Sequence, residues 1–307
     1  MSILAIDFGG TRTRTAWYDE QLNQKARAET PSLVDYGPDD VIRRIIDTAR
    51  QVVPPNEPVR AIGISGPGPL NPRTGILYHA KTLPGWRDIP LAKILSEAFG
   101  GAPARLENDA NLAALAEYKQ GAAQGCNPVI YLTISTGIGG GAIIDGKLFT
   151  GWSGLAIEPG HMRLRLADGQ IERLEALASG TAIGHIARER LKVTNQSSVL
   201  RQKNVIDGKT VGEAAEAGDS FALEIIHEAG TWLGIGLVNL LHLFSPEAIV
   251  IGGSVSKLGD LLLDPARVVI SQQILDQIFL PTNLIRTAQL GDDVCLVGAA
   301  LHVRELC

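Results

Sequence analysis

The chain has 307 residues, of which 45% are hydrophobic and 20% charged, as is usual for a soluble enzyme large enough for two domains. Its net charge is −5 and it has no long basic run, which argues against nucleic acid or an anionic membrane as its main partner. We expect a cytoplasmic protein, since no signal peptide or bilayer-length apolar stretch is recognised and the three cysteines lie far apart.

The first part of the sequence predicts alternating strands and helices. Two strands, Ile3–Phe8 and Thr13–Tyr18, flank Gly9-Gly10-Thr11, which indicates a hairpin with a glycine turn. Lys25–Thr30 would add a third strand. Further strands are expected at Val59–Ser65 and Pro103–Leu106, and helices at Pro38–Val53, Leu91–Phe99 and Asn111–Gln120. This alternation favours an α/β fold with a mixed sheet.

The same opening arrangement recurs after a small, polar segment at Gly121–Asn127. A strand at Pro128–Ser135 leads into a glycine-rich turn, Thr136–Gly141, and a second strand, Ala142–Asp145. The later elements are expected to be helices at Ile171–Leu191, Ser220–Phe244 and Leu296–Leu306, a strand at Ala248–Ile251 and a turn at Gly252-Gly253-Ser254. The recurrence predicts a duplicated fold with two lobes, 1–118 and 119–290, and a C-terminal helix, 291–307, that can pack back on the first lobe.

Both glycine turns are candidate phosphate-binding sites. Backbone N–H groups in such turns can approach an anion closely because no Cβ intervenes. Each turn alone is equally well explained as an ordinary hairpin, but the pair, each with a threonine (Thr11, Thr136), favours phosphate. A dinucleotide-binding site is rejected because a β-type run follows Gly137–Gly141 where a helix is needed, and no Walker A pattern is present.

Two aspartates stand beside these features. Asp109 is placed in the first turn of a helix, where it can be an ordinary cap or a general base that the helix dipole keeps ionised. Asp7 ends the first strand next to the glycines, where it can shape the turn or hold Mg²⁺ through water.

An ordered set of short motifs, each weak by itself, runs along nearly the whole chain. It consists of D-F-G-G-T at 7–11, S-G-P-G-P at 65–69, L-P-G-W at 83–86, E-N-D-A-N at 107–111, S-T-G-I-G-G-G at 135–141, E-P-G-H at 158–161, L-E-x-x-A-S-G at 174–180 and I-G-G-S at 251–254. Together they resemble the ROK family of sugar kinases and repressors, within the actin-like ATPase/hexokinase fold.

The resemblance implies roles for individual positions. Asp109 is similar to the family's catalytic base. The positions implied to bind sugar are Gly68, Asn108, Glu158, His161 and Glu175. The positions implied to lie at the nucleotide and its phosphates are Asp7, Gly9, Gly10, Thr11, Arg12, Thr136, Gly137, Gly252 and Gly253. ATP and Mg²⁺ are the implied cofactors, and a homodimer the implied assembly.

The chain departs from the family pattern at the zinc site. The family usually carries three cysteines between the Gly-His and Leu-Glu motifs, whereas this chain has Leu166, Asp168 and Arg173 there. His161 with Asp168 is too small a set of ligands for structural zinc, so we expect none. Arg12 stands where a lysine is common, and we still expect it to face phosphate.

The sequence therefore predicts an ATP- and Mg²⁺-dependent kinase that phosphorylates the primary hydroxyl of a hexose, giving a sugar 6-phosphate. Glucose is the first candidate, and N-acetylglucosamine, N-acetylmannosamine, mannose and fructose remain alternatives. A sugar-sensing repressor would need a DNA-binding segment before the first hairpin, for which the start of this sequence leaves no room. A non-catalytic sugar-binding or filament-forming protein is the remaining alternative.

Overall fold

The computed structural model describes residues 2–79 and 83–306, which form two compact units. The first unit contains the chain up to Gln124, the segment Leu148–Ala156 and the chain from Gln289 on. The second unit contains Gly125–Lys147 and Ile157–Ala288. The expected boundary between 118 and 119 is wrong, because it would cut the helix α3 (Asp109–Gln120), and the short segment at 148–156 was not expected in the first unit.

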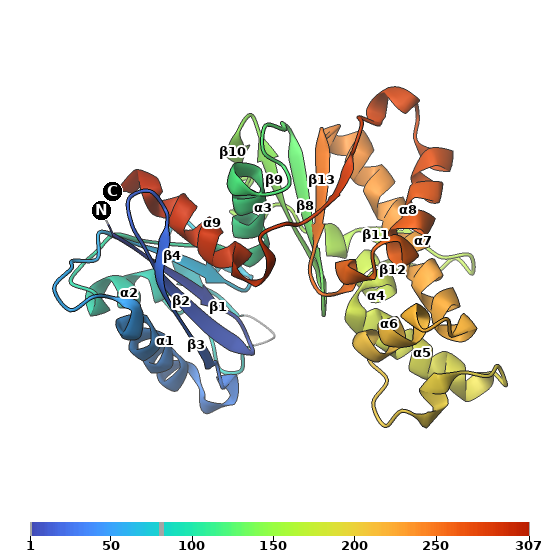
Figure 1. Ribbon diagram of the computed structural model, residues 1–307, viewed down its shortest axis with the longest axis horizontal. Helices are drawn as coiled ribbons and strands as arrows, with labels where there is room; N and C mark the ends of the chain where they lie inside the picture. The colour runs from blue at the N-terminus through green and yellow to red at the C-terminus, as the bar shows by residue number, and fades with distance from the viewer. Residues whose placement is uncertain (1, 80–82, 307) are drawn as a thin grey trace. The chain divides into compact units, whose positions relative to one another are not determined.

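The first unit is built on a five-stranded sheet of order β3-β2-β1-β4-β7 (Figure 1). Its strands are β1 (Ile3–Phe8), β2 (Arg12–Tyr18), β3 (Gln24–Pro31), β4 (Ala61–Gly66) and β7 (Ala104–Asn108). β1 and β2 pair antiparallel, which confirms the predicted hairpin, while β1, β4 and β7 run parallel. A small hairpin, β5 (Leu70–Asn71) and β6 (Ile76–Leu77), follows β4.

Both faces of this sheet are buried. Alternate residues of β1 point to opposite faces, so Leu4 and Ile6 join one core cluster and Ile3 and Ala5 another. The helices α1 (Pro38–Val52) and α2 (Leu91–Ala98) supply the first cluster, and α3 and α9 (Val294–Val303) supply the second. The last helix thus packs on the first unit, and a Cβ at Gly63 of β4 would lie 2.0 Å from the carbonyl oxygen of Ala299.

The second unit repeats the sheet order as β10-β9-β8-β13-β14. Its strands are β8 (Val129–Ile134), β9 (Ile138–Ile144), β10 (Lys147–Leu148), β13 (Ala248–Gly252) and β14 (Ile285–Thr287). The antiparallel pair β8–β9 and the parallel pairs β8–β13 and β13–β14 match the first sheet strand for strand. The predicted duplicated fold is confirmed.

Helices complete the second unit. They are α4 (Leu174–Ala178), α5 (Gly180–Val193), α6 (Gly208–Glu216), α7 (Ser220–Phe244) and α8 (Asp260–Gln273). A Cβ at Gly230 or Gly234 of α7 would strike backbone of α8, which shows how closely the two helices pack. Within the described residues only α7 has the length and hydropathy of a membrane span, and 61% of its apolar window is buried inside the protein, as in a core helix.

Two element predictions are wrong in detail. Gly139–Gly141 lie inside β9, which begins at Ile138 and not at Ala142, because glycines without side chains still pair in the ladder with β8. The single helix expected at Ile171–Leu191 is a short strand, β12 (Ile171–Arg173), followed by α4 and α5. Ser179 separates the two helices, because its extended backbone and its side-chain bond to the N–H of Ala182 start a new helix.

Candidate active site

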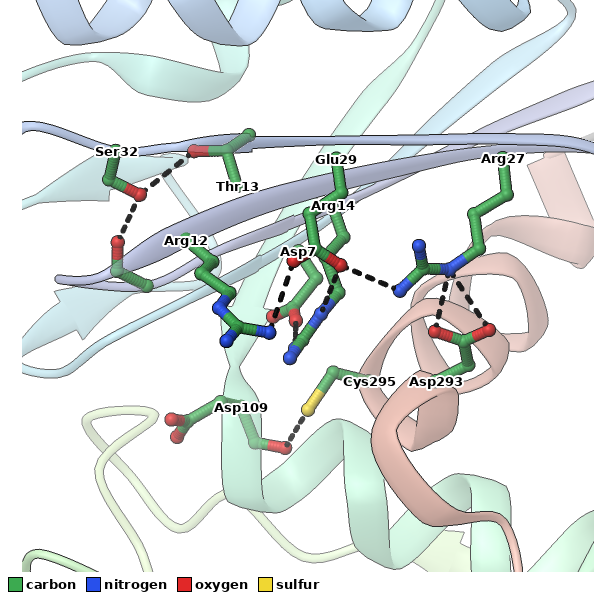
Figure 2. A network of polar contacts seen from close by, with 11 residues as sticks. Asp7, Arg12, Thr13, Arg14, Arg27, Glu29, Ser32, Asp109, Asp293 and Cys295 are labelled. Atoms are coloured by element: carbon green, nitrogen blue, oxygen red, sulfur yellow. Dashed lines mark hydrogen bonds and ion pairs between the residues drawn. The ribbon is translucent and has the colours of Figure 1, made fainter.

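The first glycine turn, Gly9–Thr11, lies between β1 and β2, and Asp7 comes just before it. Asp7 is directly opposite Arg14 in the strand register, and its Oδ2 lies 3.0 Å from Arg14 Nη1 (Figure 2). Burial raises the pKa of Asp7, while the Ser65 hydroxyl and the Arg14 guanidinium oppose that rise. The carboxylate next to the turn is therefore buried and already matched by a cation.

Glu29 of β3 is the centre of a charged network beside this turn. Its carboxylate contacts Arg12 Nη1 at 3.1 Å, Arg14 Nε at 3.5 Å and Arg27 Nη2 at 3.0 Å. Arg27 in turn donates to both oxygens of Asp293, at 3.0 and 3.2 Å. These arginines lower the pKa of Glu29 by hydrogen bonding and charge. Arg12, predicted to face phosphate, is thus held along the sheet by Glu29, and its side chain stays exposed.

The strand β7 delivers Asn108 and Asp109 to the start of α3. Asn108 is the N-cap and its Oδ1 accepts from the N–H of Ala110 at 2.9 Å. Asp109 is the first helical residue and is exposed, and its Oδ1 accepts from the same N–H at 2.8 Å. The carboxylate of Asp109 thus lies at the positive end of the helix dipole, where the ionised form is favoured.

Side chains behind Asp109 fix its backbone. Glu107 is 1% exposed and accepts from the N–H of Asn108 and the amide of Asn111, at 2.8 and 3.0 Å. Burial raises the pKa of Glu107, and these two bonds oppose the rise. From α9, the thiol of Cys295 donates to the main-chain carbonyl of Asp109 at 3.6 Å, while in Figure 2 the Asp109 carboxylate points away from it.

The loop after β4 lies against Asn108. A Cβ at Gly68 would be 3.4 Å from Asn108 Nδ2, and the next peptide bond, Gly68–Pro69, is cis. The first unit therefore brings together Gly68, Asn108 and Asp109.

The second unit holds the other three predicted sugar positions. Glu158 and His161 lie at the two ends of one tight turn, where the N–H of His161 donates to the Glu158 carbonyl at 3.1 Å. Burial raises the pKa of Glu158, with a further rise from Glu175 and an opposing effect from His161. Glu175 is the second residue of α4, after Leu174, and its Oε2 accepts from the N–H of Ile138 at 3.1 Å. Glu175 is thus bound to the second glycine turn as well as close to Glu158.

Backbone contacts shape the second glycine turn, Thr136–Gly137. The N–H of Ser135 donates to the Gly137 carbonyl at 2.9 Å, and the Ser135 carbonyl accepts from the N–H of Gly180 at 2.7 Å. Gly253, after β13, has φ +89° and approaches Ile134 so closely that a Cβ would lie 2.4 Å from its carbonyl oxygen. The predicted positions 136, 137, 252 and 253 therefore meet at the ends of β8 and β13.

A pocket of about 540 Å³ opens beside this turn. Its lining residues come from the turn, the start of α5, the start of α6 and the segment after β13: Ser135, Thr136, Gly180, Thr181, Asp207, Gly208, Lys209, Gly212, Glu213, Glu216, Ser254, Val255, Lys257 and Leu258. Of these, only Thr136 was assigned a role from the sequence. One sign of this pocket is visible in the sequence, since Gly180 ends the L-E-x-x-A-S-G motif. Nothing in the sequence indicates that α6 also lines the pocket.

Comparison with known proteins assigns the chain to a family. The family model described as "ROK family" matches residues 3–305. The chain belongs to the ROK family. It is 33% identical to the glucokinase of Thermotoga maritima over 99% of this chain and 98% of that protein. It is 30% identical to the N-acetylmannosamine kinase of Salmonella paratyphi A over 98% of each. Its structure is similar to that of a ROK family glucokinase from Streptomyces griseus in complex with glucose and AMPPNP, with a TM-score of 0.81, 32% identity and coverage of 99% and 100% of the two chains.

The metal chemistry of this ROK protein rests on few donors. Among residues 2–79 and 83–306 no group of three or more His, Cys, Asp or Glu side chains is placed to hold a metal ion. Asp7 adds one carboxylate beside the first turn, and Arg14 occupies its Oδ2. This donor set fits a Mg²⁺ held mainly by the phosphates of a nucleotide, with Asp7 reached through water.

Proposed function

We propose that this ROK protein is an ATP-dependent kinase that transfers a phosphoryl group to a hydroxyl of a hexose, with glucose as the first candidate and a sugar 6-phosphate as product. The main observation in support is that Asp109 is exposed at the N-terminus of α3, next to the N-cap residue Asn108. The similarity to glucokinases along nearly the whole chain supports the same reaction.

Asp109 is the proposed general base. It accepts the proton of the sugar hydroxyl as that oxygen attacks the γ-phosphorus in line. A sugar hydroxyl is a very weak acid, so the base must be ionised and well aimed more than it must be strong. The helix dipole favours the ionised form, and the bonds of Glu107 and Cys295 hold the Asp109 backbone in place.

The nucleotide is proposed to occupy the pocket of the second unit, with its phosphates at the glycine turn beside that pocket. The volume suits a nucleoside, and the charged side chains in its lining, Asp207, Lys209, Glu213, Glu216 and Lys257, can bond to the polar groups of its base and ribose. Thr136, Gly137, Gly252 and Gly253 are proposed to lie near the phosphates in this unit, and Gly9, Gly10, Thr11 and Arg12 in the first. Mg²⁺, bound by the phosphates and reached by Asp7 through water, would neutralise part of their charge.

Sugar-binding positions are proposed in each unit. Asn108 and the loop at Gly68 serve in the first unit, and Glu158, His161 and Glu175 in the second. Glu175 Oε2 accepts from the N–H of Ile138 and Oε1 is paired with Arg173 at 3.8 Å, so the carboxylate is held in place and each oxygen keeps a second lone pair for a hydroxyl. The similarity to an N-acetylmannosamine kinase keeps N-acylhexosamines as second candidates. We also propose a cytoplasmic homodimer that binds neither nucleic acid nor membrane and uses no zinc.

The test is ADP release from Mg-ATP with a panel of hexoses and N-acylhexosamines. We expect turnover that depends on one preferred sugar and a phosphorylated product that mass spectrometry and NMR assign to the 6-hydroxyl. Turnover without any added sugar would indicate an ATPase of another kind. If the protein binds a sugar measurably but turns over none, the better interpretation is a non-catalytic sugar-binding protein.

A further inference from the structure

The first glycine turn is held by a buried serine that follows β3. Ser32 is fully buried, and its main-chain N–H donates to the Thr11 carbonyl at 2.9 Å. Its hydroxyl donates to the Gly9 carbonyl at 2.7 Å and lies 3.1 Å from the hydroxyl of Thr13. Because Ser32 has a single hydroxyl proton and gives it to Gly9, Thr13 must be the donor in the second contact. Figure 2 shows the Ser32 hydroxyl between Thr13 and a carbonyl of the turn.

This contact replaces a hydrogen bond that a tight hairpin normally makes. The two residues that flank a two-residue turn usually exchange two bonds, and the bond from Gly9 N–H to the Arg12 carbonyl is present at 3.0 Å. In the part of the chain that the structure describes, the reciprocal bond from Arg12 N–H to the Gly9 carbonyl is not made. That carbonyl accepts from Ser32 instead.

The consequence is an asymmetric turn. Its carbonyls at Gly9 and Thr11 point back to Ser32, and within the described residues no main-chain bond is donated by the N–H groups of Gly10 or Thr11, or by Arg12 N–H to the Gly9 carbonyl. Successive N–H groups of this kind form a concave anion-binding site, whereas a carbonyl turned toward the same place would repel phosphate oxygens.

We infer that Ser32 is a positioning residue for the nucleotide triphosphate. It withdraws the Gly9 carbonyl from Arg12 N–H, so that the N–H groups of Gly10, Thr11 and Arg12 can bind phosphate oxygens. The inference rests on the proposed function, because it takes the first turn as a phosphate site. It adds a residue outside the glycine motif that no motif in the sequence indicated.

The deciding variant is Ser32→Ala. Without the hydroxyl the Gly9 carbonyl can capture Arg12 N–H and close the turn. We expect the Kd of ATP and the KM for ATP to rise about tenfold, as the loss of one or two charge-assisted bonds implies, while the Kd of adenosine and the Kd of sugar stay unchanged. Ser32→Thr keeps the hydroxyl and should restore ATP binding. Ser32→Cys, with a weaker donor of similar size, should fall between, and it serves if the alanine variant does not fold.

The matched control is Thr15→Val. Thr15 is also fully buried, lies on β2 two residues beyond Thr13, and donates its hydroxyl to the Thr48 carbonyl at 3.2 Å, away from the turn. The Thr15→Val variant should have a lower melting temperature and an unchanged ratio of ATP affinity to adenosine affinity.

Three results would overturn the role of Ser32. They are an equal loss of adenosine and ATP binding in Ser32→Ala, a loss of stability alone as in Thr15→Val, and a threonine variant no better than alanine. Calorimetric binding of ATP and adenosine needs no sugar, so it tests Ser32 even where the sugar panel gives no turnover. If the wild-type protein phosphorylates no sugar but Ser32→Ala still weakens ATP binding as expected, the proposed function is refuted. The role of the first turn in binding phosphate then still holds.

Discussion

The two glycine turns occupy equivalent places in equivalent sheets, yet different forces hold them. In the first unit, side chains shape the turn: Ser32 binds the Gly9 carbonyl and Glu29 holds Arg12. In the second unit, one carboxylate and close packing shape it: Glu175 accepts from the N–H of Ile138, a Cβ at Gly137 would lie 2.4 Å from Glu175 Oε2, and one at Gly253 would lie 2.4 Å from the Ile134 carbonyl oxygen. At Gly9 the same Cβ would lie 3.5 Å from the Arg12 carbonyl oxygen, an ordinary contact. Two glycine turns with similar sequences therefore differ in whether a side chain larger than hydrogen fits at the glycine.

The largest expected effect comes from the proposed catalytic base, which lies in the first unit. If only the first unit carries the base, Asp109→Asn should reduce turnover roughly a thousandfold while ATP and sugar still bind, because the amide cannot accept the hydroxyl proton. Steady-state kinetics and calorimetry measure the two parts. Glu158→Gln is the control, since it should weaken sugar binding more than turnover at saturating sugar. If Asp109→Asn keeps near-normal turnover, another residue must be the base.

A pair of glycine substitutions tests the difference in packing. Gly137→Ala should lower the free energy of unfolding by about 1 kcal/mol, because the new methyl group must push the end of the Glu175 side chain away from the Ile138 N–H. Gly9→Ala should change it by less than about 0.5 kcal/mol. Urea unfolding of both variants measures the comparison. Similar losses in the two would mean that the turns are equally crowded.

The pH dependence of sugar binding should reveal Glu158. Burial raises the pKa of this carboxyl, and its ionised form accepts stronger bonds from sugar hydroxyls than the neutral acid does. Sugar affinity should therefore fall as the pH decreases through this raised pKa, beginning above the value of about 4.3 usual for glutamate. Glu158→Gln should remove the effect. An acid limb that survives in this variant would assign the titration to another group.

The smallest effect concerns the exposed end of the network in the first unit. Arg27 and Asp293 are each about one-third exposed, so their ion pair is screened by solvent. Arg27→Ala should cost less than about 1 kcal/mol of stability, and the difference from wild type should shrink further in high salt. Thermal unfolding at two salt concentrations checks this. A larger, salt-insensitive loss would show that the network is structurally essential.

Much of the fold follows from local sequence. The hairpin β1–β2, the helix α7 and the duplication were predictable because apolar periodicity and glycine position set strands, helices and turns within short windows. The errors arose where local signals compete. The glycines at 139–141 read as a turn but pair with β8, and the apolar pattern after Ile171 hides the boundary between two helices at Ser179.

The candidate site divides in the same way. Asp109, Asn108 and the glycines belong to contiguous motifs, so the sequence by itself determined the family and the candidate chemistry. Only the tertiary structure placed α6 beside the nucleotide pocket, set Ser32 behind the Gly9 carbonyl and joined Glu117 of α3 to the N–H groups of Gln289 and Leu290, each at 2.9 Å. The physical reason is that these contacts join residues far apart in the chain. A hydroxyl or carboxylate gives no local sign of the backbone group it will meet.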